Sequence, residues 1–240
     1  MENHSENLKK VYTLGAYTTI IALVGILLDV IIGNITGGDL TALPTTAIGR
    51  FLQFQQNCLL GLYNLDLLNM VNQIILIPAI IALFIVHKQA DYTGAILSLV
   101  FFLIGTAVFV SNNTALPMLE LSRKYALATT DEQRNLLAAA GEAMLAQGSH
   151  GSPGVFLGFF LPNLANLMMS WVMLKGGIFN KTTGWIGIIG SILMMFYIVL
   201  VNFVPGIEKT ATLFAMPGGL LLMAWMVLFT LKFIKLKSKI

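Results

Sequence analysis

The chain has 240 residues, of which 57% are hydrophobic and only 10% are charged, and its net charge at pH 7 is +3. Its mean hydropathy is +0.82, whereas a soluble domain carries about 25% charged residues. These values exclude an ordinary soluble domain and indicate an integral membrane protein.

Six apolar segments are long enough to cross a bilayer, because about 20 residues at ~1.5 Å each span a hydrocarbon core of ~30 Å. In chain order they are 14–33, 59–86, 94–110, 155–174, 184–204 and 213–234. They use nearly the whole sequence, so we predict an all-α bundle of six transmembrane helices in a single domain, residues 1–240. The first segment follows Lys9 and Lys10 as a signal peptide would, but its length and Asp29 favour a retained helix.

Basic residues predict the orientation of this bundle. With six spans, the two termini and the loops after the second and fourth spans share one side, which carries nine Lys residues: Lys9, Lys10, Lys88, Lys175, Lys181, Lys232, Lys235, Lys237 and Lys239. The other side carries five basic residues: Arg50, Arg123, Lys124, Arg134 and Lys209. Because cytoplasmic loops are enriched in Lys and Arg, we expect both termini in the cytoplasm and the chain in the plasma membrane. The basic tail would then face anionic lipid, and we expect no nucleic-acid partner.

The outer loop between the third and fourth spans, residues 111–153, is predicted to be helical. Pro117 suits the start of one helix, and the capping box of residues 130–133 starts a second one. Glycines at 148, 151 and 154 end it. We expect these helices to form a lid across the outer mouth of the bundle. The alternative is that the apolar stripe of the second helix rests on lipid headgroups.

Strongly polar side chains within the spans fall in the outer half of the bundle. Asp29 lies about one turn from the outer end of the first span, and Asp66 occupies the outer half of the second. Asn163 and Asn166 lie ~12–17 Å along the fourth span, near the midplane. Ionisable and polar groups at such depths cost free energy and therefore mark a candidate functional site.

Helical phase groups these side chains further. Asp66, Asn69 and Gln73 fall within about 60° of one another, whereas Asn72 is expected to contact a different helix. Asn163, Asn166 and Ser170 repeat the same spacing on the fourth span. Lipid-facing amides would each cost on the order of several kcal/mol, so we expect the two faces to meet or to share a cavity.

These positions predict an outward-open polar pocket that binds or transports a small polar or cationic solute. Its candidate ligand-binding residues are Asp66, Asn69, Gln73, Asn163, Asn166, Asp29 and Asn113. Apart from Lys232 at the inner end of the sixth span, no Lys or Arg lies within the spans, so each carboxyl is protonated, hydrated, or paired with a mobile cation or an outer-loop base such as Arg50 or Arg123. The alternative is that the amides bond helix to helix, at about 0.6 kcal/mol each.

Proline and the missing motifs narrow the function classes. Pro78, Pro162 and Pro217 are each expected to kink a span and free backbone carbonyls. No histidine lies in a span, and the sequence has no Walker loop, GxSxG, HExxH or CxxC. We therefore expect no cofactor and no metal, and the balance is against an enzyme. Two other classes stay open: an accessory subunit that packs against a membrane partner or a second copy, and a lipid-modifying enzyme at the outer leaflet.

The outer loop also carries a family resemblance, over segments 113–122, 125–130 and 139–143. These segments resemble an uncharacterised group of prokaryotic multi-pass membrane proteins, described only as a domain of unknown function. Members of that group typically read Asn-Pro-Ala-Leu where this chain has Asn113, Thr114, Ala115 and Leu116. The resemblance implies a prokaryotic plasma-membrane protein of five to six helices, and it implies no activity.

Overall fold

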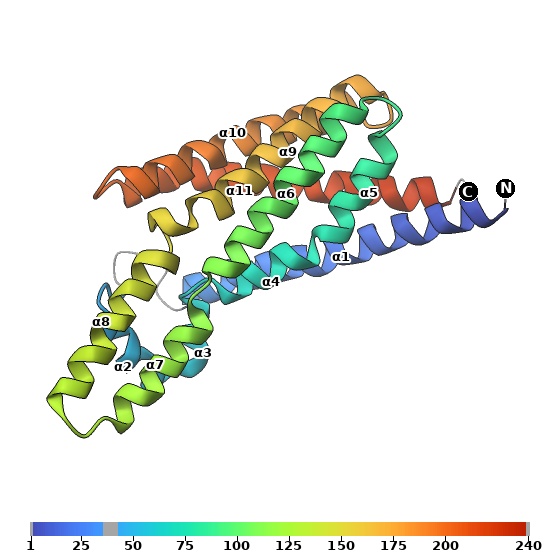
Figure 1. The fold of residues 1–240 in the computed structure, drawn as a ribbon. Coiled ribbons are helices and arrows are strands. Elements are labelled where there is room, and N and C mark those ends of the chain that lie inside the picture. The colour runs from blue at the N-terminus through green and yellow to red at the C-terminus, as the bar shows by residue number, and fades with distance from the viewer. Residues whose placement is uncertain (1, 36–42, 239–240) are drawn as a thin grey trace.

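Helices make up the secondary structure of the described residues, 2–35 and 43–238, in the computed structural model, and no strand occurs among them (Figure 1). In chain order they are α1 (Glu2–Ile35), α2 (Ala47–Gln56), α3 (Cys58–Tyr63), α4 (Leu67–Ile75), α5 (Ile77–His87), α6 (Tyr92–Asn112), α7 (Ala115–Leu127), α8 (Asp131–Gly148), the short 3₁₀ helix η2 (Pro153–Val155), α9 (Phe156–Gly176), α10 (Lys181–Phe203) and α11 (Glu208–Lys237).

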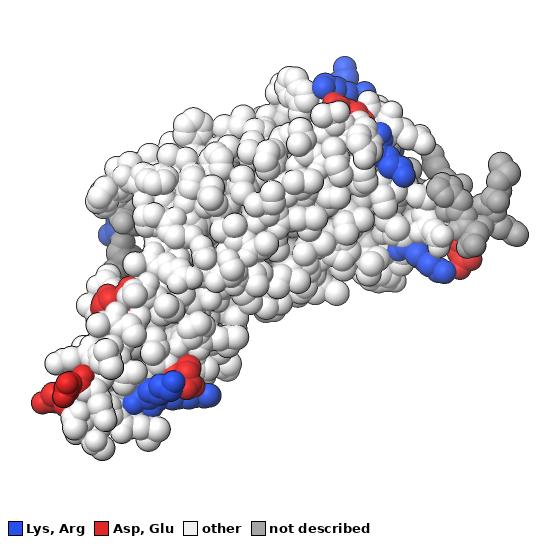
Figure 2. All heavy atoms as spheres, viewed as in Figure 1, with Lys and Arg blue, Asp and Glu red and all other residues white. Residues whose placement is uncertain are grey.

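Six helical segments of the described chain are long and apolar enough to cross a membrane. They are Ser5–Gly33, Leu67–His87, Tyr92–Leu127, Pro153–Gly176, Lys181–Phe203 and Lys209–Lys237. On the face drawn in Figure 2, the charged side chains gather at the two ends of the molecule and leave an uncharged band between them. The prediction of an all-α membrane bundle with six spans is confirmed.

The bundle has two distinct ends. The start of α1 and the end of α11 lie together at one end, the termini end (Figure 1). The opposite end carries α2, α3, α7 and α8, and we call it the distal end. At the termini end α1 and α11 are in contact, since the rings of Tyr12 and Phe233 stack with their centroids 6.0 Å apart. Towards the distal end these two helices diverge.

Small residues allow close packing in the centre of the bundle. Helix α6 packs along α9, where Ser98 donates a hydrogen bond of 2.7 Å to the carbonyl of Ala165. A Cβ atom at Gly105 would overlap the ring of Pro162, and one at Gly158 would lie 2.9 Å from Phe109 Cα. Close approach through small residues is how helices associate where lipid removes the hydrophobic driving force.

The second span begins later than the sequence predicted. Residues 59–86 were expected to form one helix, but α3 ends at Tyr63 and the spanning helix α4 starts at Leu67. Asp66 lies between them in the left-handed region, with φ 59° and ψ 24°. A second break separates α4 from α5, because Pro78 occupies the first turn of α5 and cannot donate to the turn before it.

The outer loop forms a helical hairpin of α7 and α8, and α2 packs against one side of this hairpin. α7 and α8 project from the distal end (Figure 1), and Thr130 caps α8 by accepting from the amide of Gln133. Phe51 of α2 is fully buried between them. Two polar contacts attach α2: Glu142 accepts from the amide of Ala47 at 2.7 Å, and Ser122 donates to the carbonyl of Phe51 at 2.9 Å. The predicted stripe is only partly packed, since Leu136 is 73% exposed.

The contact between Gly105 and Pro162 makes a stability prediction. We expect Gly105→Ala to lower the free energy of unfolding by about 1–3 kcal/mol, because the added methyl group overlaps a rigid ring. Gly219→Ala in α11 is the matched control, since its Cβ meets nothing within 4 Å. Thermal unfolding of both variants in detergent measures the difference, and equal midpoints would show that α6 and α9 do not pack this closely.

Candidate functional site

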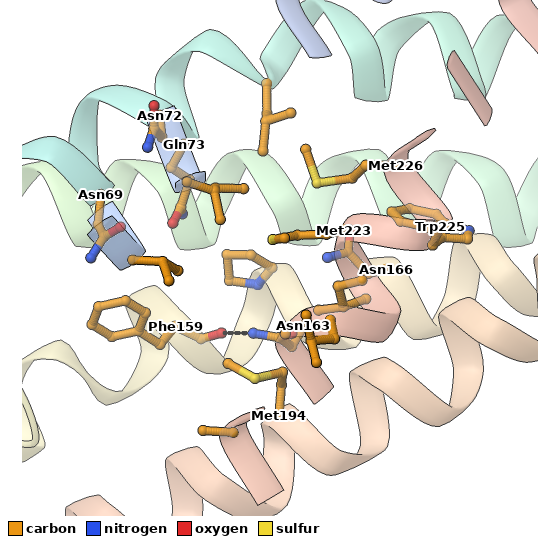
Figure 3. A pocket seen from close by; sticks show the side chains of 18 of the residues that line it. Asn69, Asn72, Gln73, Phe159, Asn163, Asn166, Met194, Met223, Trp225 and Met226 are labelled. Carbon is orange, nitrogen blue, oxygen red and sulfur yellow. Dashed lines mark hydrogen bonds between the residues drawn. The ribbon is translucent and has the colours of Figure 1, made fainter. Parts of the chain in front are cut away.

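A cavity of about 540 Å³ lies inside the bundle, and amide side chains from two helices line it (Figure 3). Four predicted site residues meet there: Asn69 and Gln73 from α4, and Asn163 and Asn166 from α9. Asn72 of α4 also lines it. We call this space the amide cavity. The structure therefore brings together the two polar faces that the sequence placed at similar depths.

Gln73 is held in place by hydrogen bonds to two helices. Its Nε2 atom donates to the hydroxyl of Thr106 at 3.3 Å and to the carbonyl of Gly158 at 3.4 Å. That carbonyl is available because Pro162, four residues later, has no N–H to donate to it. The predicted effect of Pro162 is thus present, and the carbonyl that it releases accepts from a side chain of the protein.

Two amides in the cavity wall retain unused hydrogen-bonding atoms. Asn163 donates to the carbonyl of Phe159 at 2.9 Å (Figure 3), but its buried Oδ1 has no partner among the described residues. Within the same described ranges, Nδ2 of the buried Asn72 has none. Asn72 packs against Gly25 of α1, as the expected helix contact requires. A buried polar atom without a partner costs about 1–3 kcal/mol, which a bound ligand can recover.

The rest of the amide cavity is apolar and opens sideways. Met194, Met223, Met226 and Trp225 form much of its surface (Figure 3). Side chains of α1 and α11 that also line it are exposed on the surface of the bundle, namely Leu27, Val30, Met216 and Leu220. None of the described residues that line it is Asp, Glu, Lys, Arg or His. The cavity is therefore bordered by exposed apolar side chains of α1 and α11, and its described lining carries no formal charge.

Asp66 does not line this cavity. Its carboxylate accepts from Asn69 Nδ2 at 3.0 Å through one oxygen and pairs with His150 Nδ1 at 3.0 Å through the other. The second ring nitrogen of His150 lies 2.8 Å from the hydroxyl of Tyr197 in α10. Asp66, His150 and Tyr197 thus form a continuous hydrogen-bonded chain from the start of α4, through the turn after α8, to α10.

A second cavity, of about 460 Å³, lies beside this chain at the distal end. His150, Tyr197, Ser149 and Thr45 line it together with Arg50 of α2 and apolar side chains. We call it the distal cavity. It differs from the amide cavity in that a cationic residue and several hydroxyl groups face the same space.

Electrostatics favour the charged forms of Asp66 and His150. Burial raises the pKa of Asp66, but His150, Asn69 and Arg50 outweigh that effect and the pKa of the carboxyl is lowered. Burial lowers the pKa of His150, but Asp66 and Tyr197 outweigh that effect and the pKa of the imidazole is raised well above its usual value. Burial also lowers the pKa of Arg50, which stays far above neutrality for any guanidinium.

Asp29 and Asn113 occupy supporting positions near these groups. Tyr63 donates to the backbone carbonyl of Asp29 at 2.9 Å, and burial together with the Asp29 and Asp66 charges raises the pKa of Tyr63. Asn113 donates to the carbonyl of Leu65 at 2.9 Å and accepts from the amide of Ala115 at 3.2 Å. Asn113 therefore fixes the turn that precedes α4 to the start of α7, and neither residue lines either cavity.

His150 and Tyr197 were not predicted as site residues. His150 is 84 positions from Asp66 along the chain, so no local spacing relates them. A usable signal existed in the glycine-rich turn after α8, where His150 is the one ionisable residue. Arg50 was named as a partner for the carboxylates, and its charge does act on Asp66.

The Asp66–His150 pair makes a prediction for a double-mutant cycle. We expect Asp66→Asn and His150→Gln to show a coupling energy of about 1.5–3 kcal/mol in thermal unfolding, the size of a charge-assisted hydrogen bond. Asn tolerates the left-handed conformation of Asp66, so this variant removes the charge without adding backbone strain. A coupling energy near zero would contradict the pair.

The pH dependence of the same cycle follows from the two shifts. The lowered pKa of Asp66 stabilises the fold above about pH 4, and that contribution is lost as the pH falls through the lowered value. The raised pKa of His150 stabilises the fold fully below about pH 6.5, and that contribution is lost as the pH rises through the raised value. The groups that act on His150 are Asp66, Tyr197 and Asp29, with Arg50 in the same cavity. The destabilisation by His150→Gln should therefore be largest between these two limits.

Comparison with known proteins identifies a family. No curated protein and no solved structure matches the chain. A family model described as a domain of unknown function, DUF4386, matches residues 20–231 and so overlaps all six candidate spans. The expected relationship to an uncharacterised family is confirmed. The chain is a multi-pass membrane protein that belongs to the DUF4386 family.

Proposed function

We propose that this protein binds a small, uncharged, amphipathic molecule in the amide cavity. The observation that carries this proposal is the convergence of Asn69, Gln73, Asn163 and Asn166 on one otherwise apolar space of about 540 Å³. That volume lies within the range of about 300–1,000 Å³ in which small-molecule sites fall, and such sites combine apolar walls with a few placed polar groups.

The lining favours an uncharged ligand over a cation. An amide both donates and accepts, so it pairs with hydroxyl, carbonyl or amide groups. A cation would meet no carboxylate among the described lining residues, and burying a charge without a partner is costly. Asp66, the carboxylate expected to attract a cation, is paired with His150 instead. The polar solute expected from the sequence is therefore narrowed to a neutral molecule with an apolar body.

The position of the opening favours entry from the bilayer. The rim between α1 and α11 consists of exposed apolar residues such as Leu27, Met216 and Leu220. With nine Lys residues on the side of the termini against five basic residues on the other, we place both termini in the cytoplasm of a plasma membrane. The distal end, and with it the amide-bearing half of the bundle, then belongs to the outer leaflet.

The alternative role is that of an accessory subunit. The amide side chains, taken alone, would also be consistent with that role. Gln73 does bond to a backbone carbonyl of another helix, as a helix-to-helix contact requires, whereas Asn163 bonds to a carbonyl of its own helix. A bundle whose amides served packing alone would be filled, however, because protein interiors approach the density of organic crystals. The size of the cavity therefore favours a bound molecule.

Photolabelling tests the proposal. The full chain would be placed in phosphatidylcholine nanodiscs with a diazirine-bearing monoacylglycerol, irradiated, and mapped by peptide mass spectrometry. We expect saturable labelling of α9 and α11 that unlabelled monoacylglycerol reduces. Gly219 lines the cavity and faces open space, so Gly219→Phe should fill the cavity without a clash and lower the labelling at least fivefold, the effect of losing about 1 kcal/mol.

Leu213→Phe is the matched control for that experiment. Leu213 lies on the same helix, is 69% exposed to lipid and does not line the cavity. Its substitution introduces the same side chain and should leave the labelling unchanged. Labelling that survives Gly219→Phe, or that falls equally in both variants, would show that the molecule binds elsewhere on the lipid-facing surface.

The amides themselves make a separate prediction. We expect Asn166→Leu to weaken monoacylglycerol binding about fivefold, because one hydrogen bond contributes roughly 1 kcal/mol. Asn202→Leu is the comparison, since Asn202 bonds to the carbonyl of Ile198 in its own helix and lies outside the cavity. Competition of unlabelled monoacylglycerol against the photolabel measures both affinities. Tighter binding to Asn166→Leu would mean that the amides do not recognise the ligand.

A further inference from the structure

Arg50 is a buried cation that forms no ion pair with the described residues. Its side chain lines the distal cavity, and the residue is only 6% exposed. One terminal nitrogen donates to Gln53 at 3.3 Å, while Nε has no partner within the described parts of the chain. In those parts no ion pair joins Arg50 to a carboxylate. A buried guanidinium in this state needs an acceptor that the described residues do not provide.

The side chains around Arg50 can donate hydrogen bonds to the same acceptor molecule that the guanidinium needs. The hydroxyl groups of Thr45, Ser149 and Tyr197 line the distal cavity, and no Asp or Glu is among its described lining residues. Protonated His150 donates one N–H to Asp66 and the other to the oxygen of Tyr197. The proton of the Tyr197 hydroxyl is then available to a molecule in the cavity.

The charges within this cluster leave one positive charge facing the cavity. His150 and Asp66 compensate each other as an ion pair, so the guanidinium of Arg50 is the remaining charge among the described lining residues. Asp29 of α1 acts on the pair from outside, and it lines neither cavity. An anion would therefore complete the charge balance of the distal cavity.

We propose that the distal cavity binds a phosphate-type oxyanion, with Arg50 as its anchor and the hydroxyls of Ser149 and Tyr197 as further donors. The planar fork of a guanidinium matches phosphate oxygens in two parallel hydrogen bonds. The cavity, about 460 Å³, has room for a substituted phosphate. It lies at the distal end of the spans, where both a lipid headgroup and a phosphate from solution can reach it.

The first test uses the full chain in a neutral detergent without phosphate. Inorganic phosphate is titrated and the thermal unfolding midpoint is followed, because a ligand that binds the folded state raises it. We expect a saturable rise that Arg50→Gln weakens at least tenfold. Arg134→Gln is the matched control, since Arg134 lies on α8, pairs with Asp131 at 3.6 Å and does not line the cavity.

A second arm identifies the source of the phosphate. Phosphatidylcholine nanodiscs with and without phosphatidic acid are compared, and bound phosphatidic acid is counted by native mass spectrometry. Retention that requires Arg50 together with no response to inorganic phosphate would assign the ligand to a headgroup, and the reverse pattern would assign it to a soluble phosphate. If neither probe binds, or if Arg50→Gln and Arg134→Gln weaken binding equally, the proposal is wrong.

Two further variants keep the test decisive if Arg50→Gln does not fold. Arg50→Lys keeps the charge without the fork and should weaken phosphate binding severalfold. Ser149→Ala removes a donor from the partly exposed turn after α8 and should also weaken it. Gly219→Phe should leave phosphate binding unchanged, so this site and the amide cavity can fail independently. Unaltered phosphate binding in both Arg50→Lys and Ser149→Ala would overturn the assignment.

Discussion

A hydrocarbon environment offers no water to a polar group, and this constraint decides where the polar side chains of the chain lie. Gln73 donates to Gly158 and Thr106, and Ser98 donates to Ala165, so these polar side chains join neighbouring helices, whereas Asn202 satisfies its donor within its own helix. The same constraint makes buried polar atoms without a hydrogen-bond partner informative. Several buried atoms have no partner among the described residues, and those of Asn163 and Arg50 belong to residues that line a cavity.

The two cavities follow the polarity profile of a bilayer. The amide cavity lies between the spans and is lined by neutral groups, whereas the distal cavity contains Arg50 and His150 beside the helices that project from the bundle. Burying a charged group costs far less free energy at the membrane interface than in the hydrocarbon centre. A neutral amphipathic ligand in one cavity and an anion in the other are each suited to the depth at which they would bind.

Local signals in the sequence were sufficient for the spans and for part of the site. Apolar runs located all six spans, and the shared spacing on α4 and α9 brought Gln73 and Asn166 to one cavity. The turn at Asp66 was missed because residues 59–63 are as apolar as the helix that follows, so hydropathy does not mark the break. His150 was missed because its contact with Asp66 depends on how the whole outer loop folds back, and no periodicity records that.

The first part of the second span, α4, is separated from its neighbours at both ends. Helix α4 has nine residues and is bounded by two irregular joints, the left-handed Asp66 on one side and the Pro78 break on the other. It carries Asn69, Asn72 and Gln73, and Asn69 is bonded to Asp66 at the first joint. The two joints therefore free the direction of α4 from that of α3 and α5, and all three amides line the amide cavity. The carboxylate of Asp66 thus connects the first amide of this segment to His150, which lines the distal cavity.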